Sequence, residues 1–461
     1  MVEPREIGVT GRSPQRLFRL IGAKRSDELI GAAGRARAAL DGSRVWNISS
    51  TAAGGGVAEM LHSVVGYSDG LGIDDHWVVI EGDQNFFRVT KRLHNRLHGS
   101  RGDDGTLGRS EADHYEAVLA ENSVALLNRI RESDVAVLHD PQTLGLAGTL
   151  AEHGVRVVWR CHVGTERVNE FTEESWNFLK PYLAPCCAYV FSHGGFVPWL
   201  LAGSPVLIIA PAIDPYSSKN RPLDAARLDR LLIKAGLFED LGGPASSTES
   251  VFGGADPVSR EDRLVVQVSR WDHLKDMAGV LKGFAAEVAG HKGVRLALVG
   301  PEVSAVSDDP EGAGVLDECV TLWESLPQKV RSTIRIIELP MDDTELNALI
   351  VNAIQRHATV VVQKSLEEGF GLTVAEAMWK SRPVVASAVG GIVDQVAPGS
   401  GVLLSDPTDL DAFGHAVTDL LERPKEMAAM GHRARVRIRS HFLSDRLLGD
   451  CMRLIEMVTQ E

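Results

Sequence analysis

The chain has 461 residues, of which 44% are hydrophobic and 24% are charged, and its formal net charge is −14 at pH 7. This length allows two domains with separate cores, and the composition is that of an ordinary globular protein. The negative charge would repel a phosphate backbone and no basic block offsets it, so nucleic acid is not an expected partner.

The first segment, residues 1–43, is predicted to be a helical extension. Residues 14–40 are rich in Arg, Ala and Leu, which predicts one or two amphipathic helices. The start, Met1 to Glu6, lacks the basic-then-apolar order of a signal peptide, and no apolar run in the chain reaches membrane-spanning length. We therefore expect a cytoplasmic protein with no membrane partner.

A glycine-rich turn follows the first predicted strand. The strand covers residues 44–50, the turn covers 51–56, and a helix is predicted over 57–70. Gly55 and Gly56 would leave the backbone amides of a helix N-terminus bare for a phosphate. Because the spaced G-x-G-x-x-G pattern is absent, a dinucleotide site is not indicated.

The next predicted strand, residues 76–80, runs into the carboxylates Glu81 and Asp83. Helices are predicted over residues 86–98 and 112–131. The polar, glycine-rich loop between them, residues 99–108, is expected to be mobile.

Polar residues then follow two more strands, predicted at 134–141 and 156–163. Because the carboxyl ends of parallel strands meet at one edge of an open α/β sheet, we expect His139, Asp140 and His162 to converge there. A lone histidine is more often structural than catalytic, but three polar residues at consecutive strand ends favour a ligand site. No paired spacing such as H-E-x-x-H supports a metal.

Strands at 189–192 and 206–210 complete the first predicted sheet. Residues 211–215 contain two prolines and are a predicted crossing point between the domains. Residues 241–262 have a loop-like composition, and we expect partial disorder there.

Two cations follow the first strand of the second half. This strand begins at Leu264 and ends at Arg270, and Lys275 stands at the start of the next helix. Both could be surface charges, but an arginine directly after a buried apolar strand favours a site. A fixed Arg and Lys can neutralise a diphosphate leaving group where other enzymes use a metal ion, so no metal or other cofactor is expected.

The sequence predicts its main ligand loop after the strand at 358–364. Gly369 and Gly371 allow a sharp turn and a close ligand approach, and the helix predicted over Leu372 to Lys380 offers free amides to an anion.

Two carboxylates flank the glycines of this loop, with Glu368 on the loop and Glu376 in the first turn of the helix. Both can face one ligand. A structural alternative for Glu376 is a capping box with Thr373, three residues earlier.

The remaining strands, at 294–300, 335–339, 383–386 and 401–404, alternate with helices, which predicts a doubly wound parallel sheet in an α/β protein. The predicted domains are 44–213 and 263–440, joined by a linker and loop at 214–262 and followed by a C-terminal helix at 441–461. The five cysteines show no CxxC spacing and indicate neither a disulfide framework nor a zinc site.

Several motifs resemble those of retaining family 4 glycosyltransferases. They are Ser-Arg-Trp-Asp-His-Leu-Lys-Asp at 269–276, Glu-Gly-Phe-Gly-Leu-Thr-Val-Ala-Glu-Ala-Met-Trp at 368–379, and Ala-Val-Gly-Gly-Ile at 388–392. In the N-terminal half, Val45 to Glu59, His139-Asp-Pro-Gln142 and Trp159-Arg-Cys-His162 resemble the trehalose glycosyltransferring synthases. The resemblance implies a GT-B fold with two Rossmann-like domains facing across a cleft, a homodimer, and transfer of glucose from a nucleoside diphosphate glucose to glucose with retention, giving α,α-trehalose.

The resemblance also implies residue roles. The residues near the reacting atoms would be Glu368, Arg270, Lys275 and His162. The donor would be bound by Arg270, Lys275, Gly55, Gly56, Gly369, Gly371, Leu372, Thr373 and Glu376. The acceptor would be bound by Glu81, Asp83, Phe86, His139, Asp140 and His162.

One position departs from the resemblance. The trehalose-forming family carries an Asp after Arg-Cys-His-Ile/Val, whereas this chain has Gly164, and residues 165–170 also differ. If that Asp contacts the acceptor, a small acceptor other than glucose is the alternative.

No carboxylate is placed as a nucleophile, so we prefer a front-face displacement in which the leaving phosphate takes the acceptor proton. A sugar phosphorylase and a non-catalytic sugar-nucleotide sensor are the competing classes. The sequence does not select among ADP, UDP and GDP.

Overall fold

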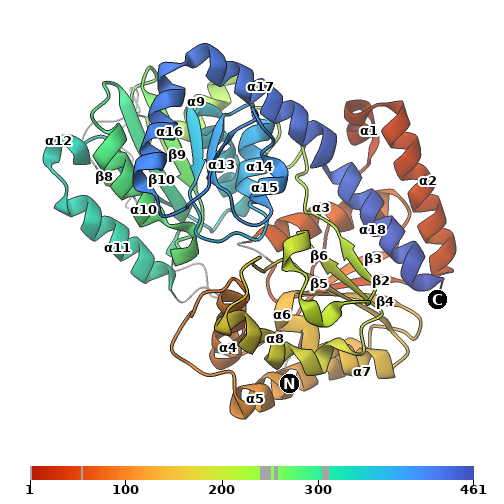
Figure 1. Cartoon of the computed structure of the whole chain (residues 1–461). Helices are drawn as coiled ribbons and strands as arrows, with labels where there is room; N and C mark the ends of the chain where they lie inside the picture. The colour runs from red at the N-terminus through yellow and green to blue at the C-terminus, as the bar shows by residue number, and fades with distance from the viewer. Residues whose placement is uncertain (1–2, 53–54, 239–250, 254–257, 304–310, 461) are drawn as a thin grey trace. The chain divides into compact units, whose positions relative to one another are not determined.

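The computed structural model describes residues 3–52, 55–238, 251–253, 258–303 and 311–460 (Figure 1). It divides into two units, Met1–Ala212 with Phe442–Glu461, and Ile213–His441. The first boundary falls within residues 211–215. Each unit has one seven-stranded sheet with helices packed on it, so the predicted α/β class is confirmed.

The sheet of the first unit has the order β1-β3-β2-β4-β5-β6-β7, in which β1 is antiparallel to β3 and all other pairs are parallel. Its central strands are short runs of mainly β-branched and aliphatic residues that are buried on both faces, as parallel strands require. The strands are β1 (Arg5–Glu6), β2 (Val45–Ser49), β3 (Asp75–Val79), β4 (Val135–His139), β5 (Arg156–Cys161), β6 (Ala188–Phe191) and β7 (Val206–Ile208).

The helices of the first unit include the last helix of the chain. They are α1 (Gln15–Ile21), α2 (Ala23–Leu40), α3 (Gly56–Gly70), α4 (Gln84–Leu97), α5 (Arg109–Leu127), α6 (Asp140–Thr143), α7 (Ala147–Glu152), α8 (Glu170–Leu183) and α18 (Ser444–Thr459). Helix α18 packs along α2, where Arg25 makes two hydrogen bonds of 2.8 Å to the carboxylate of Asp445 (Figure 1).

The N-terminal helices pack on the first unit, and the C-terminal helix, which was predicted as a segment of its own, belongs to the same unit. Leu29 of α2 and Leu448 of α18 share one buried cluster with Trp77 of β3. The apolar stripes of these helices cover one face of the first sheet, which explains why they belong to this unit.

The sheet of the second unit has the order β14-β13-β12-β9-β10-β11-β8, and all its pairs are parallel except β8 with β11. The strands are β8 (Val251–Gly253), β9 (Arg263–Val268), β10 (Val294–Pro301), β11 (Ile334–Leu339), β12 (Val360–Gln363), β13 (Val384–Ser387) and β14 (Val402–Leu404). The helices are α9 (Ala225–Lys234), α10 (Met277–Gly283), α11 (Gly312–Ser325), α12 (Gln328–Arg331), α13 (Thr344–His357), α14 (Leu372–Trp379), α15 (Ile392–Gln395), α16 (Leu410–Glu422) and α17 (Pro424–His441).

The segment 214–262 is not only linker and loop. It contains helix α9, and strand β8 adds an antiparallel edge to the second sheet through its pairing with β11. A three-residue edge strand is too short to give a periodic sequence signal. The rest of the predicted disordered stretch, residues 241–250 and 254–257, lies outside the described residues.

The glycine-rich loop at 99–108 is held by two arginines of α4, in contrast to the predicted mobility. Arg92 donates hydrogen bonds to Asp103 and to the Thr106 carbonyl oxygen. Arg96 donates to the Gly105 carbonyl oxygen at 2.7 Å. Because both guanidinium groups are nearly buried, these bonds fix the loop on α4.

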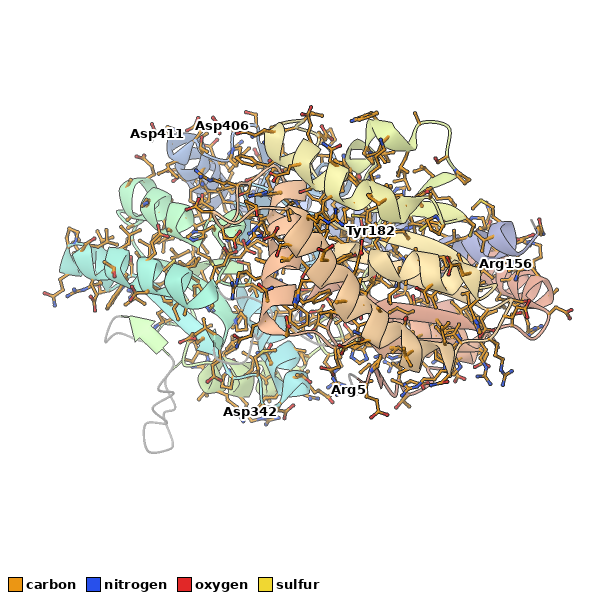
Figure 2. All side chains as sticks on the ribbon, turned by 90° about the horizontal axis from the view of Figure 1, so that it is seen from below. Arg5, Arg156, Tyr182, Asp342, Asp406 and Asp411 are labelled. Carbon is orange, nitrogen blue, oxygen red and sulfur yellow. The ribbon has the colours of Figure 1, made fainter. Side chains whose placement is uncertain are left out.

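Charged side chains cover the outside of both units, and Arg5, Asp342, Asp406 and Asp411 are examples of exposed ones (Figure 2). Within the described residues, no helix combines the length and the apolar character that crossing a bilayer would need.

Candidate active site

Both sheets have a topological switch point, where a central strand has its sequence neighbour on one side and a later strand on the other. In the first unit, β2 lies between β3 and β4, and in the second unit β9 lies between β10 and β12. Open α/β sheets bind ligands at the carboxyl ends of the strands that flank such a point.

In the second unit, Lys275 and Glu368 meet at the switch point. Lys275 follows β9, Glu368 follows β12, and the Lys275 Nζ donates a hydrogen bond of 2.8 Å to Glu368 Oε2. The Ser365 hydroxyl donates to the same oxygen at 3.3 Å. The two charged side chains remain 17% and 12% exposed, so a ligand can reach them.

Arg270 lies on the same strand end as Lys275. Its Nη2 is 3.7 Å from Asp272 Oδ2, and its side chain is 28% exposed whereas Asp272 is buried. Asp272 also accepts a hydrogen bond of 2.8 Å from the Leu274 amide, which shapes the turn that leads to Lys275. This edge therefore presents two cations, as predicted.

A second ion pair supports this edge and was missed by the sequence analysis. The buried Lys364, at the end of β12, pairs with Asp276, which follows the β9 turn. The Gln267 side chain links the same two segments, because it donates to the Lys275 carbonyl oxygen at 2.7 Å and accepts from the Lys364 amide at 3.1 Å. The sequence did contain a signal for this ion pair, because Gln267 and Lys364 are polar residues within or directly after otherwise apolar strands.

The glycine loop begins α14 as predicted. Gly371 is the N-cap residue with φ +81°, a conformation that favours glycine, and Leu372 is the first residue of the helix. The Gly369 carbonyl oxygen accepts a hydrogen bond of 3.1 Å from the Gly391 amide. The loop is thus held against a second glycine turn.

The capping-box alternative for Glu376 is wrong. Thr373 is the second residue of α14 and not its N-cap, and its hydroxyl donates to Gln363 Oε1 at 2.9 Å. Glu376 is buried, with 1% of its surface exposed.

In the first unit, His139, Asp140 and His162 converge as predicted. The two imidazoles are stacked with ring centroids 5.5 Å apart, and His139 Nδ1 lies 3.2 Å from His162 Nε2. Asp140 Oδ1 accepts a hydrogen bond of 2.7 Å from the His162 amide. Asp140 has φ +62°, a left-handed conformation that this short acidic residue tolerates.

Burial shifts the ionisation of all three groups. It lowers the pKa of His139 and of His162 well below the ordinary histidine value, with a further contribution from Arg160. It raises the pKa of Asp140 to about 7. Both imidazoles are therefore neutral at pH 7.

The Asp140→Asn variant is expected to gain stability relative to the wild type as the pH rises from about 4 to about 7. In this window the native carboxyl keeps a proton that the unfolded chain, with an ordinary aspartate pKa of about 4, has lost, so Asp140 costs the wild type stability. The difference in free energy of unfolding should grow by up to about 1.4 kcal/mol per pH unit and stay constant above pH 7. Urea unfolding of both proteins between pH 4.5 and 8 measures it, and a pH-independent difference would contradict the shifted pKa.

Two of the predicted acceptor residues have structural roles. Phe86 is fully buried and stacks on Tyr115 with ring centroids 5.8 Å apart, so its assignment as a ligand-facing ring is wrong. Asp83 caps α4 by accepting a hydrogen bond of 2.7 Å from the Phe86 amide, and this bond, with His114, lowers its pKa. Glu81 is exposed, and its backbone is bound by Asn122.

The first glycine turn is described only in part, since its residues 53–54 lie outside the described residues, and Gly55 is its informative position. Gly55 is the N-cap of α3, whose first residue is Gly56, and its backbone is extended at φ −152°. A Cβ placed on Gly55 would meet no described heavy atom within 4 Å. Packing among the described residues thus does not require a glycine here, which is consistent with space kept for a ligand.

Gly164 has a packing reason. A Cβ at this position would lie 2.6 Å from the Cβ and Cγ of Phe196, which is itself buried. The Gly164 carbonyl oxygen is 2.9 Å from His98 Nδ1, so the backbone cannot easily move away. Phe196 occupies the volume that a side chain at 164 would need.

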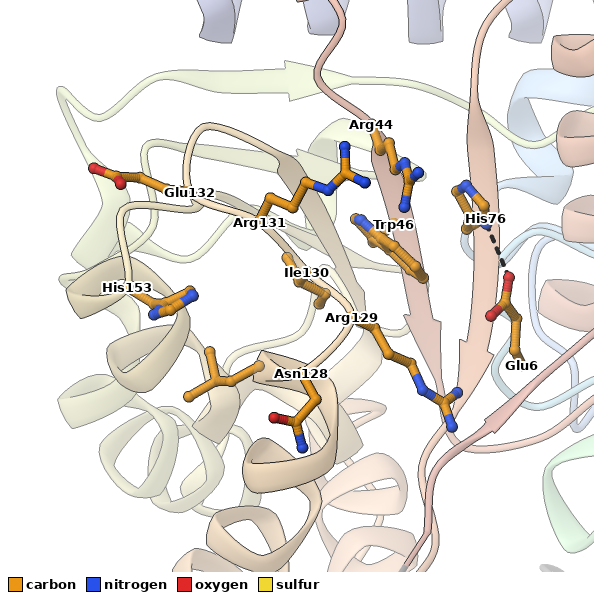
Figure 3. A pocket seen from close by; sticks show the side chains of 11 residues that line it. Glu6, Arg44, Trp46, His76, Asn128, Arg129, Ile130, Arg131, Glu132 and His153 are labelled. Carbon is orange, nitrogen blue, oxygen red and sulfur yellow. Dashed lines mark hydrogen bonds and ion pairs between the residues drawn. The ribbon is translucent and has the colours of Figure 1, made fainter.

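A pocket of about 610 Å³ lies at the opposite, amino end of the first sheet, and Arg44, Trp46 and His76 form one of its walls (Figure 3). His76 is within 2.9 Å of Glu6 and 2.8 Å of Asp74, and Arg44 pairs with Asp74 at 3.1 Å. The pocket is separate from the histidine pair at the carboxyl ends of the strands.

The chain is similar to known proteins over nearly all its length. A family model described as "Trehalose synthase, N-terminal domain" matches residues 47–198, and one described as "Glycosyl transferases group 1" matches residues 344–437. A trehalose synthase of Rubrobacter xylanophilus is 37% identical over 430 residues, which cover 93% of this chain and 92% of that protein. A trehalose phosphorylase of Grifola frondosa is 27% identical over 403 residues, which cover 81% of this chain and 51% of that protein. The solved structure of a UDP-forming trehalose-phosphate synthase from Burkholderia xenovorans superposes with a TM-score of 0.68 at 16% identity, over 91% of this chain and 100% of that one.

Proposed function

The chain belongs to the trehalose synthase family of glycosyltransferases, and from this premise we propose that it transfers glucose from a nucleoside diphosphate glucose to free glucose, with retention, to give α,α-trehalose. It is a glycosyltransferase of trehalose metabolism with the GT-B fold. The observation that supports the proposed donor chemistry most directly is the pair of reachable cations, Arg270 and Lys275, at the switch point of the second sheet.

In this proposal, Arg270 and Lys275 bind the diphosphate and stabilise the charge that develops when the bond to the sugar breaks. The amides at the start of α14, behind Gly369 and Gly371, add donors for the same anion. Glu376 binds the ribose, for which its buried carboxylate must become accessible when the donor enters.

The acceptor binds to the first unit in this proposal, at the edge where His139, Asp140 and His162 meet. The acceptor hydroxyl attacks the anomeric carbon on the face from which the diphosphate departs, and its proton passes to the departing phosphate oxygen. This route needs neither a carboxylate nucleophile nor a metal.

We also propose a homodimer, which light scattering would test.

A trehalose phosphorylase is the second candidate function, because a fungal phosphorylase is 27% identical over most of this chain. Such an enzyme would use inorganic phosphate at the cationic edge in place of the nucleotide.

The deciding experiment incubates the purified protein with ADP-, UDP- or GDP-glucose, each with glucose, glucose 6-phosphate or no acceptor, and identifies the sugar product by NMR. We expect nonreducing α,α-trehalose from glucose with at least one donor. A parallel incubation contains trehalose with and without inorganic phosphate, and phosphate-dependent breakdown there, with no transfer from any nucleotide sugar, would establish the phosphorylase. Donor hydrolysis without trehalose would point to a different acceptor.

A further inference from the structure

Five polar side chains form one continuous hydrogen-bond chain across the first sheet. They lie on or directly after five neighbouring strands, from β6 to β3. The contacts are Ser192 Oγ to His162 Nδ1 at 3.1 Å, His162 Nε2 to His139 Nδ1 at 3.2 Å, His139 Nε2 to Asn47 Oδ1 at 2.9 Å, and Asn47 Nδ2 to Asp75 Oδ1 at 2.7 Å.

The donor and acceptor capacities of these side chains fix the direction in which each hydrogen bond of this hydrogen-bond chain is donated. An ionised carboxylate only accepts, so Asn47 must turn its NH₂ group to Asp75 and its oxygen to His139. His139 then donates from Nε2, and its Nδ1 can only accept. His162 must therefore carry its proton on Nε2, and its Nδ1 accepts from the Ser192 hydroxyl.

We propose that Asn47 is a positioning residue that fixes, through His139, the tautomer and the ring orientation of His162. The inference rests on the proposed function only in that His162 stands at the sugar-transfer site. Asn47 lies in the middle of β2 and was not among the residues singled out from the sequence.

The hydrogen-bond chain limits what His162 can do in the sugar transfer. Both ring nitrogens of His162 are engaged within the protein, so neither is free to take the acceptor proton. A further proton on His139 would go to Nδ1 and set two N–H groups against each other at the 3.2 Å contact, and burial disfavours a further proton on His162 Nδ1. The arrangement thus keeps His162 neutral and fixed, which fits a mechanism in which the leaving phosphate takes the proton.

The direction depends on the charge of Asp75. Burial raises the pKa of this carboxyl to about 7, against the opposing effects of Ser68 on α3, His76 and Asn47, while Asp74 adds to the rise. Cys451 on α18 also interacts with it. A protonated Asp75 can donate to the Asn47 oxygen, after which the amide turns over and each histidine carries its proton on Nδ1.

The test is long-range ¹H–¹⁵N NMR of the histidine-labelled full chain without substrate. At pH 8, both His139 and His162 should show the Nε2–H tautomer. In Asn47→Leu, His139 loses its acceptor, so both histidines should change to Nδ1–H. The control is Thr143→Val, because this buried hydroxyl donates at 2.8 Å to the His139 carbonyl oxygen but lies outside the chain.

The same variants separate positioning from mere stability. Asn47→Leu should lower kcat about tenfold with an unchanged KM for the donor, and Thr143→Val should leave both unchanged. A folded Asn47→Leu with wild-type histidine spectra, or with changed spectra and a wild-type kcat, would overturn the proposal. If the wild type transfers no glucose, the proposed function fails, whereas the NMR spectra still decide which histidine nitrogens carry the protons and thus the direction of the hydrogen bonds.

A measurement on the wild type covers the case that Asn47→Leu does not fold. Lowering the pH from 8 to 6 should shift both histidines together toward the Nδ1–H tautomer. In Asp75→Asn, which cannot titrate, the tautomers should not change with pH. Independent changes of the two histidines in the wild type would show that they are not linked as proposed.

Discussion

Replacing Lys275 with Met is expected to lower the turnover number by about 10²-fold or more, which is the usual loss when one group that stabilises transition-state charge is removed. Lys275 is the cation at the switch point of the second sheet, and its position is defined by a 2.8 Å hydrogen bond to Glu368. Arg270→Met should have an effect of the same order, because its guanidinium lies on the same strand end and is 28% exposed.

The measurement is initial-rate kinetics with the best donor and with glucose, after the melting temperature has confirmed that each variant is folded. Lys282→Met is the matched control, because Lys282 is an exposed lysine on the next helix, α10. A Lys275→Met enzyme with normal turnover and only a raised KM for the donor would show that Lys275 binds ground state and transition state equally.

Gly164→Ala is expected to destabilise the protein by about 1–3 kcal/mol, the usual cost of an overpacked core. The new Cβ would lie 2.6 Å from the Cβ and Cγ of Phe196, whose side chain is buried at 3% exposed. Gly164→Asp should cost more, since it adds a carboxylate at the same crowded position.

Two comparisons make the result specific. Gly148→Ala is the control, because a Cβ there meets no described heavy atom within 4 Å, and within helix α7 it should stabilise by up to about 1 kcal/mol. Combining Gly164→Asp with Phe196→Ala should recover stability, because the two residues compete for one volume. Additive losses in the double variant would contradict that account. If the double variant folds, its acceptor preference tests whether an aspartate at 164 contacts the sugar.

The sequence predicted the sheets well because buried parallel strands are short, continuous apolar runs, as at β9 and β12. It also placed His139, Asp140 and His162 together, since strand ends meet at one edge. It could not assign Phe86, because an aromatic residue at a helix start has the same pattern whether its ring faces the core or a ligand. Asn47 and Lys364 were missed because their importance comes from partners on other strands.

The return of the chain to its first unit affects the order of folding during synthesis. The second unit is one continuous segment, Ile213–His441, whereas the first needs α18, which is synthesised after the whole of the second unit. Domains fold as units once their residues are available. The first unit would therefore remain incomplete, with the apolar surface under α18 uncovered, until α18 has emerged from the ribosome. In nascent chains the second unit should thus be complete before the first.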